Sequence, residues 1–284
     1  MAAVKPRLVL LIVLYLLALA AALLEAQTGP EIRIARAAGP IVVDGDLSDP
    51  GWKGATKVDT FYETNPGDNV PPKVRTVAYL TYDEKFFYAA FEFYDPDISL
   101  LRAPYGDRDA LPGYTDYGGV ILDTHGSART AIEYLVNPHN IQYDAIQDDA
   151  SGEDSSPDYF WDSATKIEKD RWVLEMRIPF STLRYSHANP QVWSILLYRN
   201  YPRAFRYQMF SSKLPRGGNC FICRSSRLTG LENLPPGGHL VVAPYGTAKE
   251  VGVPRGDLGA PLVNKPIRFN GGVDAKWKIG RAHV

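Results

Sequence analysis

The sequence is poor in cysteine and has no excess of charge of either sign. Its 284 residues include only two cysteines, and 31 Lys and Arg stand against 32 Asp and Glu, for a net charge of −1. Two cysteines cannot supply the four ligands of a structural zinc site. Balanced charge without a basic run argues against nucleic-acid binding. A hydrophobic content of 45% is ordinary for a globular protein of one large domain or two small ones.

The common catalytic motifs are also missing. The sequence has no phosphate-binding loop, no HExxH and no Ser-His-Asp order, and its five His residues are scattered. Asp116, Asp123 and Glu175 could supply the carboxylate pair of a glycoside hydrolase, but strand-type sequence surrounds all three and structural roles suit them as well. We therefore expect a non-catalytic protein, with part of a glycoside hydrolase as an alternative.

The first 26 residues form a segment of their own. Lys5 and Arg7 precede an uninterrupted apolar run from Leu8 to Leu24. This order predicts a secretory signal helix over residues 1–26, with cleavage after Ala26, and an uncleaved membrane anchor is the alternative. In both cases the rest of the chain should lie outside the cytoplasm.

The two cysteines form a single C-x-x-C, at Cys220 and Cys223. Haem attachment would require His at the following position, where this chain has Arg224, and no βαβ pattern indicates a thioredoxin-like site. In an exported protein such a pair is expected to form a local disulfide. We predict that this bond pins the Gly217-Gly218 loop.

From Glu31 onward the periodicity is almost entirely of strand type. Val74–Tyr82 alternates apolar with polar residues, and Phe86–Tyr94 is aromatic on both faces, which is typical of a central strand. Roughly ten short strands without an amphipathic helix predict an all-β antiparallel β-sandwich. The acidic, Ser-rich segment Asp148–Tyr159 should be a surface loop, and Pro179–Leu183 a single helical turn.

The segment Ile41–Trp52 joins a β-branched run, a turn and a lone tryptophan. Ile41-Val-Val should form a short strand that reverses at Asp44-Gly45. Trp52 should fold beneath it into the core, where we also expect Trp172 and Trp193. The acids of this segment are expected to be turn residues, with calcium ligation as the alternative for Asp44, Asp46 and Asp49.

Five segments, in order, resemble family 9 carbohydrate-binding modules. They are VVDGDLSDPGW at 42–52, Val77–Asp83, Phe87–Phe93 followed by Asp95-Pro96, Asp116–Asp123 and Trp172–Phe180. The resemblance implies a jelly-roll-like β-sandwich over residues 27–246 that binds a polysaccharide or oligosaccharide without cleaving it. It also suggests a link to the breakdown of xylan- or cellulose-type polysaccharides.

Sugar binding by a β-sandwich requires aromatic faces for stacking, with amide, Arg or carboxylate groups for the hydroxyls. Trp161 follows a polar loop and is the tryptophan that we expect beside a surface groove. The candidate carbohydrate-binding residues are Trp161, Tyr114, Tyr117, Arg108, Asp116 and Asn137, with Tyr159, Phe160 and Asp158 as further candidates.

The chain departs from the sugar-binding members of this family at two places. Where they resemble Trp-x-x-Asp-x-x-Glu, this chain has Gly113–Gly119, so that Tyr114 is the nearest substitute for the tryptophan and Gly119 replaces the glutamate. The second stacking tryptophan is absent, and Phe221 is the nearest aromatic residue.

Further motifs resemble a bacterial family of large exported proteins, in which a family 9-like module precedes a domain similar to an outer-membrane β-barrel. They include Arg108-Asp-Ala110, Val136-Asn-Pro138, Leu228–Leu231, Pro244-Tyr245 and Gly272–Lys276. The resemblance implies a periplasmic or outer-membrane-associated location in a Gram-negative bacterium. Its partners would be a saccharide, the chain's own barrel and, through the barrel, the outer membrane. A structural or gating domain of the barrel that binds no sugar is the alternative.

Residues 247–278 should then be a Gly/Pro-rich linker and the first barrel strand, Gly271–Lys278. Because a lone barrel strand cannot satisfy its own edges, we expect the chain beyond Thr247 to be extended or disordered. Ile279–Val284 matches the translation of a common sequencing-adapter end, so residues 279–284 are expected to be an artefact.

Calcium is the one cofactor that the sequence suggests. The family resemblance suggests an ion-stabilised fold, and two loops offer oxygen donors for calcium. Asp95 and Asp97 of the Asp95-Pro-Asp97 loop are candidate ligands, and the Gln147–Asp149 loop is a second candidate. Solvated turn acids are the alternative.

Overall fold

The computed structural model describes residues 29–218, 220–235, 240–254, 256 and 261–277. The predicted signal helix at 1–26 and the adapter-like end at 279–284 therefore lie outside the described residues. The chain divides into two compact units, Met1–Pro235 and Pro236–Val284. Within the described ranges no helix is long and apolar enough to cross a membrane.

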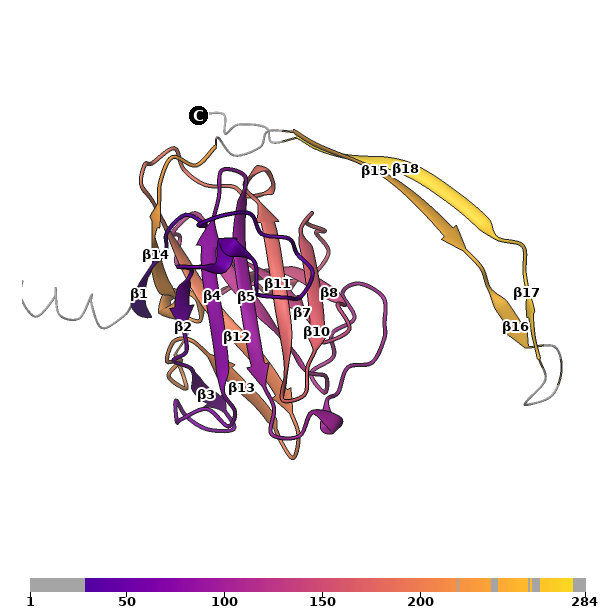
Figure 1. The fold of residues 1–284 in the computed structure, drawn as a ribbon, viewed down its shortest axis with the longest axis horizontal. Coiled ribbons are helices and arrows are strands. Elements are labelled where there is room, and N and C mark those ends of the chain that lie inside the picture. The colour runs from indigo at the N-terminus through magenta and orange to yellow at the C-terminus, as the bar shows by residue number, and fades with distance from the viewer. Residues whose placement is uncertain (1–28, 219, 236–239, 255, 257–260, 278–284) are drawn as a thin grey trace, which may run out of the picture. The chain divides into compact units, whose positions relative to one another are not determined.

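The first unit is a β-sandwich of two sheets that lie face to face (Figure 1). The nine-stranded sheet has the order β1 (Gly29–Arg33), β14 (Ser226–Leu231), β12 (Gln191–Pro202), β6 (Tyr117–Asp123), β7 (Thr130–Val136), β8 (Gln142–Asp148) and β9 (Gly152–Asp154); β13 (Arg206–Phe210) pairs with β12, and β3 (Tyr62–Asn65) pairs with β13. The five-stranded sheet has the order β10 (Asp162–Ile167), β11 (Arg171–Pro179), β5 (Phe86–Tyr94), β4 (Thr76–Tyr82) and β2 (Thr56–Val58).

This architecture confirms the all-β sandwich that the period-2 pattern predicts. Every strand pair of the unit is antiparallel except β1 with β14, which is parallel. Among the described residues of this unit, the helical content consists of short 3-10 turns: η1 (Pro50–Trp52), η2 (Ile98–Leu100), η3 (Phe180–Thr182) and η4 (Ile222–Arg224). The turn expected at Pro179–Leu183 is thus present as η3. The expected surface loop at Asp148–Tyr159 is partly wrong, because β9 within it extends the sheet beyond β8.

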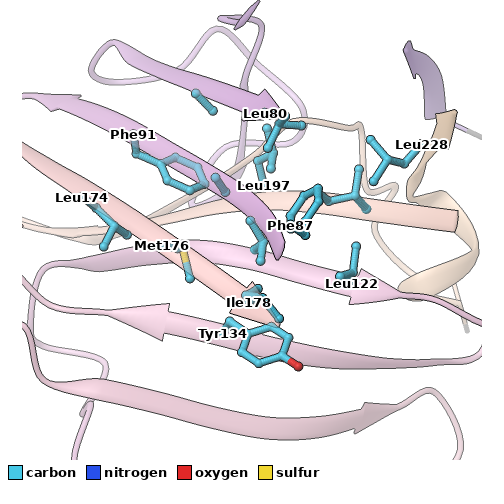
Figure 2. Close-up of a cluster of buried hydrophobic side chains, with 14 of the residues drawn as sticks. Leu80, Phe87, Phe91, Leu122, Tyr134, Leu174, Met176, Ile178, Leu197 and Leu228 are labelled. Atoms are coloured by element: carbon cyan, nitrogen blue, oxygen red, sulfur yellow. The ribbon is translucent and has the colours of Figure 1, made fainter. Parts of the chain in front are cut away.

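The core lies between the two sheets and is built from the inward face of each strand (Figure 2). In β5 every second residue from Phe87 to Phe93 is inward and fully buried, as the pleat requires. The ring of Phe93 stacks on Trp172 with 4.2 Å between ring centroids. Trp172 and Trp193 are both fully buried, so their predicted place in the core is confirmed.

The segment Ile41–Val43 does not form the strand that its β-branched residues predicted. The N–H of Val42 donates to Asp49 Oδ2 at 2.7 Å. The N–H groups of Asp44 and Gly45, just after the segment, donate to Glu175 Oε2 at 2.9 and 2.7 Å. Carboxylates from elsewhere take up these donors, so the backbone is satisfied without a neighbouring strand.

The turn and the tryptophan that follow this segment are confirmed. Gly45 adopts a φ of 86°, a left-handed conformation that glycine reaches without steric cost. Trp52 is buried, packs edge-on against Tyr88, and donates its indole Nε1–H to Glu175 Oε1 at 2.7 Å. One buried carboxylate therefore holds both the turn and the ring of this segment.

The second unit contains two two-stranded antiparallel sheets rather than a linker and a lone strand. β15 (Leu240–Lys249) pairs with β18 (Arg268–Trp277), and β16 (Gly252–Pro254) pairs with β17 (Leu262–Asn264). The predicted boundary after residue 246 therefore falls inside a strand. The strand expected at Gly271–Lys278 corresponds to β18. β18 is paired with β15. The ring of Tyr245 on β15 lies over Gly272 of β18, where it would clash with any side chain. The backbone of these strands is extended, as expected beyond Thr247, but it is paired rather than alone.

Candidate functional site

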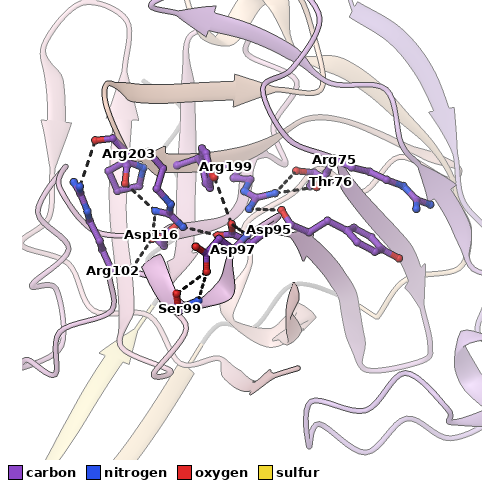
Figure 3. A network of polar contacts seen from close by, with 12 residues as sticks. Arg75, Thr76, Asp95, Asp97, Ser99, Arg102, Asp116, Arg199 and Arg203 are labelled. Atoms are coloured by element: carbon purple, nitrogen blue, oxygen red, sulfur yellow. Dashed lines mark hydrogen bonds and ion pairs between the residues drawn. The ribbon is translucent and has the colours of Figure 1, made fainter. Parts of the chain in front are cut away.

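Asp116 and Asp95 lie in a buried ionic network instead of facing a ligand (Figure 3). Arg203 donates to both carboxylates, and its Nη1 lies 2.8 Å from Asp116 Oδ2. The backbone N–H of Arg102 donates to the same Asp116 oxygen at 2.8 Å. Burial raises the pKa of the Asp116 carboxyl and these donors oppose that shift. Asp116 cannot reach a saccharide, so its predicted binding role is wrong.

A second buried arginine joins the two sheets beside this network (Figure 3). Arg199 of β12 donates to the carbonyl oxygens of Arg75 and Tyr94 at 2.9 and 2.8 Å, across to the five-stranded sheet. Burial lowers the pKa of its guanidinium to about 10, and the nearby Asp116 and Asp95 counteract this effect. The charges of the network are compensated internally, which identifies it as a structural element of the sandwich.

Trp161 is a core residue, contrary to the prediction of a ring beside a surface groove. Its residue is only 6% exposed, and its indole packs edge-on against Tyr134 with centroids 5.4 Å apart. The indole Nε1–H donates to Asp144 Oδ1 at 3.0 Å. Arg108, another predicted binding residue, forms an ion pair with the same Asp144. The partner that draws both side chains inward lies on β8, far away in the sequence.

The other predicted binding residues lie apart from one another. Asn137 is buried and closes the β7–β8 turn, accepting from the N–H groups of His139 and Ile141 at 3.0 and 2.9 Å. Tyr114 is 66% exposed in the loop before β6, where it lines no described cavity. Neither residue is placed to bind the same ligand as Tyr117. Among the further candidates, Phe160 is exposed, Tyr159 packs on the core and Asp158 forms an ion pair with Arg108.

The suggested calcium ligands are engaged in local contacts. Asp97 accepts from the N–H of Ser99 at 3.1 Å at the start of η2, and Asp95 pairs with Arg203. Asp44, Asp46 and Asp49 each accept from a backbone N–H of their own segment. No group of three or more His, Cys, Asp or Glu side chains that could hold a metal ion occurs in the described part of the chain.

The three carboxylates considered for hydrolysis do not converge. Asp123 accepts from the N–H groups of His125 and Ala128 at 3.0 and 2.8 Å and closes the β6–β7 turn. Glu175 belongs to the other sheet, where it holds the Asp44-Gly45 turn. The pair expected of a glycoside hydrolase is therefore not formed by these residues.

A cavity of about 300 Å³ lies on the outer face of the nine-stranded sheet, the face turned away from the main core. In β6, Val120 and Leu122 point into the core, whereas Tyr117 and Ile121 point outward. This outer face carries its own apolar cluster, which explains why β6 is buried along its whole length. The cavity is lined by Leu111, Tyr117, Ile121, Glu133, Leu135, Tyr143, Gln147, Glu153, Tyr198, Arg206, Gln208, Phe210 and Phe221.

Gly119 interrupts the outer face between two of the lining side chains. It pairs with Tyr198 of β12 on one side and with Leu135 of β7 on the other. A Cβ atom at this position would come within 2.1 Å of the carbonyl oxygen of Tyr134. The sheet therefore admits only glycine at position 119. Its neighbours Tyr198 and Leu135, which both line the cavity, have no side chain between them.

The aromatic rings of the cavity are held by polar neighbours. Arg206 donates from Nη2 to Tyr117 Oη at 2.9 Å and from Nε to Asn200 Oδ1 at 2.8 Å. Gln208 donates from Nε2 to Tyr198 Oη at 2.9 Å. These bonds fix the orientations of both tyrosines, so little side-chain freedom remains to be lost when a ligand binds.

Two carboxyl groups face the same cavity, one with a hydrogen-bond donor from the protein and one without. Glu153 of β9 accepts from the Tyr143 hydroxyl. Glu133 of β7 is only 6% exposed, and no described residue forms a hydrogen bond or ion pair with its carboxyl. Burial, with a contribution from the Glu153 charge, raises the pKa of Glu133 to about 8. At neutral pH its carboxyl is therefore mostly protonated and can donate as well as accept a hydrogen bond.

Phe221 reaches the cavity from the loop between the two cysteines. Cys220 and Cys223 form the predicted disulfide. The N–H groups of Phe221 and Ile222 donate to Asp149 Oδ1 at 3.1 and 3.2 Å, and the Phe221 ring meets Phe210 edge-on with centroids 5.5 Å apart. The disulfide and Asp149 together hold a half-exposed ring beside the outer face.

Of the predicted binding residues, only Tyr117 lines the cavity, joined by Phe221, which the sequence identified as the nearest aromatic substitute. The sequence alone did not indicate the other polar and aromatic lining residues Glu133, Glu153, Tyr143, Tyr198, Arg206 and Gln208. One signal could have found the first of these: in β7, TAIEYLV, a single glutamate interrupts an otherwise apolar outer face. The others come from strands whose adjacency only the fold reveals.

Comparisons with known proteins establish the fold. Neither models of known protein families nor curated protein sequences match this chain. Among solved structures, a family 9 carbohydrate-binding module from Caldicellulosiruptor kristjanssonii in complex with glucose has a TM-score of 0.51 and 17% identity, over 69% of this chain and 94% of that one. The same kind of module from this organism in complex with cellotriose has a TM-score of 0.50 and 16% identity, over 69% and 92%. A candidate carbohydrate-binding protein from Bacteroides uniformis has a TM-score of 0.57 and 8% identity, over 71% and 99%.

Proposed function

We propose that the sandwich binds a saccharide, without cleaving it, in the cavity on the outer face of the nine-stranded sheet. The observation that carries this proposal is the lining itself. Five aromatic side chains converge there with an amide pair, a guanidinium and two carboxyls. Aromatic faces suit the CH surfaces of a sugar ring, and planar polar groups suit its hydroxyls. The fold supports the proposal, because two structures that share it hold glucose and cellotriose.

The size of the cavity limits the ligand. About 300 Å³ is at the lower end of the range for small-molecule sites. We therefore propose that it holds one or two sugar units, and that a longer glycan would continue outside it. Phe221, half-exposed at the cavity, is the ring that we assign to stacking. Gln147 and Gln208 supply amide groups for the hydroxyls.

Isothermal titration of the whole chain with glucose and cello-oligosaccharides tests the proposal. Phe221→Ala should weaken binding by about fivefold, because the contact of one aromatic ring is worth about 1 kcal/mol. Tyr114→Ala is the matched control, since it also removes one aromatic ring but lies outside the cavity. Equal losses in the two variants, or none in Phe221→Ala, would contradict the assigned site. No binding of any sugar would favour the alternative, a structural or gating domain.

We also propose that the protein is exported and acts in polysaccharide breakdown at the cell envelope. The charged start and apolar run of residues 1–26 support export, as does the Cys220–Cys223 disulfide, because disulfides persist in oxidising compartments. The motifs shared with exported β-barrel proteins support the outer-membrane association. Cell fractionation with the mass of the mature protein would test this location, and a cytosolic, uncleaved chain would refute it.

A further inference from the structure

Glu133 faces the cavity without the partners that a buried carboxyl requires. Most other buried acids of the sandwich accept several hydrogen bonds, as Asp144 does from Trp161, Tyr159 and Arg108, and Glu63 accepts one from the N–H of Gly67. Glu133 is also buried and has no donor among the described residues. An unpartnered buried carboxyl is costly to keep. Its remaining partners are water and a ligand in the cavity.

The second carboxyl lies on the same side of the cavity. Glu153 of β9 pairs in register with Gln147 of β8, and Gln147 pairs with Ala131, two residues before Glu133 on β7. The two acids thus project from the same face of the sheet, with only β8 between their strands. Adjacent strands are about 4.8 Å apart, so the two backbones are about 10 Å apart across β8, with an offset of two residues along the sheet. At this separation the charge of Glu153 contributes to the raised pKa of Glu133.

In the part of the chain that the structure describes, no cation that lines the cavity pairs with either acid. Among the described residues, the titratable groups that line the cavity are Glu133, Glu153, Arg206, Tyr117, Tyr143 and Tyr198. Arg206 is the one cation of this set, and it donates to the neutral oxygens of Tyr117 and Asn200 rather than to either acid. Two carboxyls that share a site cannot both ionise readily unless a cation lies near them.

We propose that the saccharide bound here carries a free amino group, as an unacetylated amino sugar does, and that its ammonium lies between Glu133 and Glu153. This inference rests on the proposed function and names the class of sugar. The ammonium supplies the donors that Glu133 lacks and the positive charge that the acid pair lacks. The aromatic rings contact the sugar face, as they would for a neutral sugar.

Glucosamine, N-acetylglucosamine and glucose are the probes, titrated into the whole chain at about neutral pH and low salt. Glucosamine should bind about tenfold tighter than the other two, the lower end of what close charge pairs contribute. Because the ammonium favours the ionised carboxyl, glucosamine binding should also release a proton. Titration in two buffers of different ionisation enthalpy measures this release, which should be absent for glucose.

Variants locate the effect. Glu133→Gln and Glu153→Gln should each reduce the ratio of the glucosamine affinity to the N-acetylglucosamine affinity. Glu84→Gln is the matched control, because its side chain is 81% exposed and lies outside the cavity. Melting temperatures verify that each variant folds. Equal affinity for glucosamine and N-acetylglucosamine would overturn this inference and leave the proposed function standing. Failure of all three sugars and of the cello-oligosaccharides to bind would refute both.

Discussion

Replacing Glu133 with glutamine should remove a pH dependence from the stability of the sandwich. The ordinary pKa of this carboxyl is 4.5, and burial beside Glu153 raises it to about 8 in the folded protein. The folded state therefore binds the proton more tightly than the unfolded state does. It follows that the contribution of Glu133 to the free energy of unfolding is fully present below pH 4.5 and is lost as the pH rises to about 8.

The magnitude follows from the gap between these two pKa values. One pKa unit corresponds to about 1.4 kcal/mol, so the gap sets a ceiling of about 5 kcal/mol on the stability lost between pH 4.5 and pH 8. Water entering the cavity reduces the penalty for the charge, and we expect a loss of about 2–3 kcal/mol. The amide of the Glu133→Gln variant has no proton to lose, so its burial would add only an offset that does not vary with pH.

Urea denaturation of the wild type and of Glu133→Gln, from about pH 5 to about pH 9, measures this difference. The wild type should lose stability relative to the variant as the pH rises, and the Glu84→Gln control should follow the wild type. Parallel curves for the wild type and Glu133→Gln would show that Glu133 ionises normally. In that case the carboxyl is neither buried nor unpartnered, and the reasoning about the cavity fails.

Two further predictions concern residues that the structure assigns to stability. Trp161→Phe should destabilise the protein by about 1–3 kcal/mol, because it leaves the buried Asp144 without its indole donor. The affinity for saccharide should not change. A loss of affinity at unchanged stability would show that Trp161 belongs to the binding site. Glu175→Ala should cost at least about 3 kcal/mol, because it leaves two backbone N–H groups and the Trp52 indole without an acceptor. Urea denaturation followed by tryptophan fluorescence measures both, and a near-neutral Glu175→Ala would mean that Glu175 does not hold the turn.

Much of the fold could be predicted because its strands alternate with period 2. Phe86–Tyr94 is apolar on both faces, as expected of a central strand, and it forms β5 inside the five-stranded sheet. Local pattern fails where distant groups decide the hydrogen bonding. Ile41–Val43 has strand propensity, but Asp49 and Glu175 take the backbone donors in and just after it. Residues 247–266 have the composition of a linker, yet strands on both sides of them pair.

The candidate site was harder to predict, because its residues come from several neighbouring strands. Tyr117 was found through its place in a family-like motif. Trp161 was misplaced because a polar neighbourhood in the sequence suggests exposure, whereas Asp144 provides a buried partner for the indole. The apolar outer face of β6 was indistinguishable from core sequence. Only the register of β7, β8 and β9 shows that Glu133 and Glu153 share that face.

The hydrogen bonding of the buried acids separates structural groups from groups of the site. Glu175 and Asp144 each accept three or more hydrogen bonds, and a charge so compensated can stay buried without help from a ligand. Glu133 is also buried and has, among the described residues, none of this compensation. An apolar residue at position 133 would avoid the cost and would continue the cluster formed by Ile121 and Leu135 on either side. A carboxyl here weakens the fold, and the proposed ligand of the cavity is what would offset this cost.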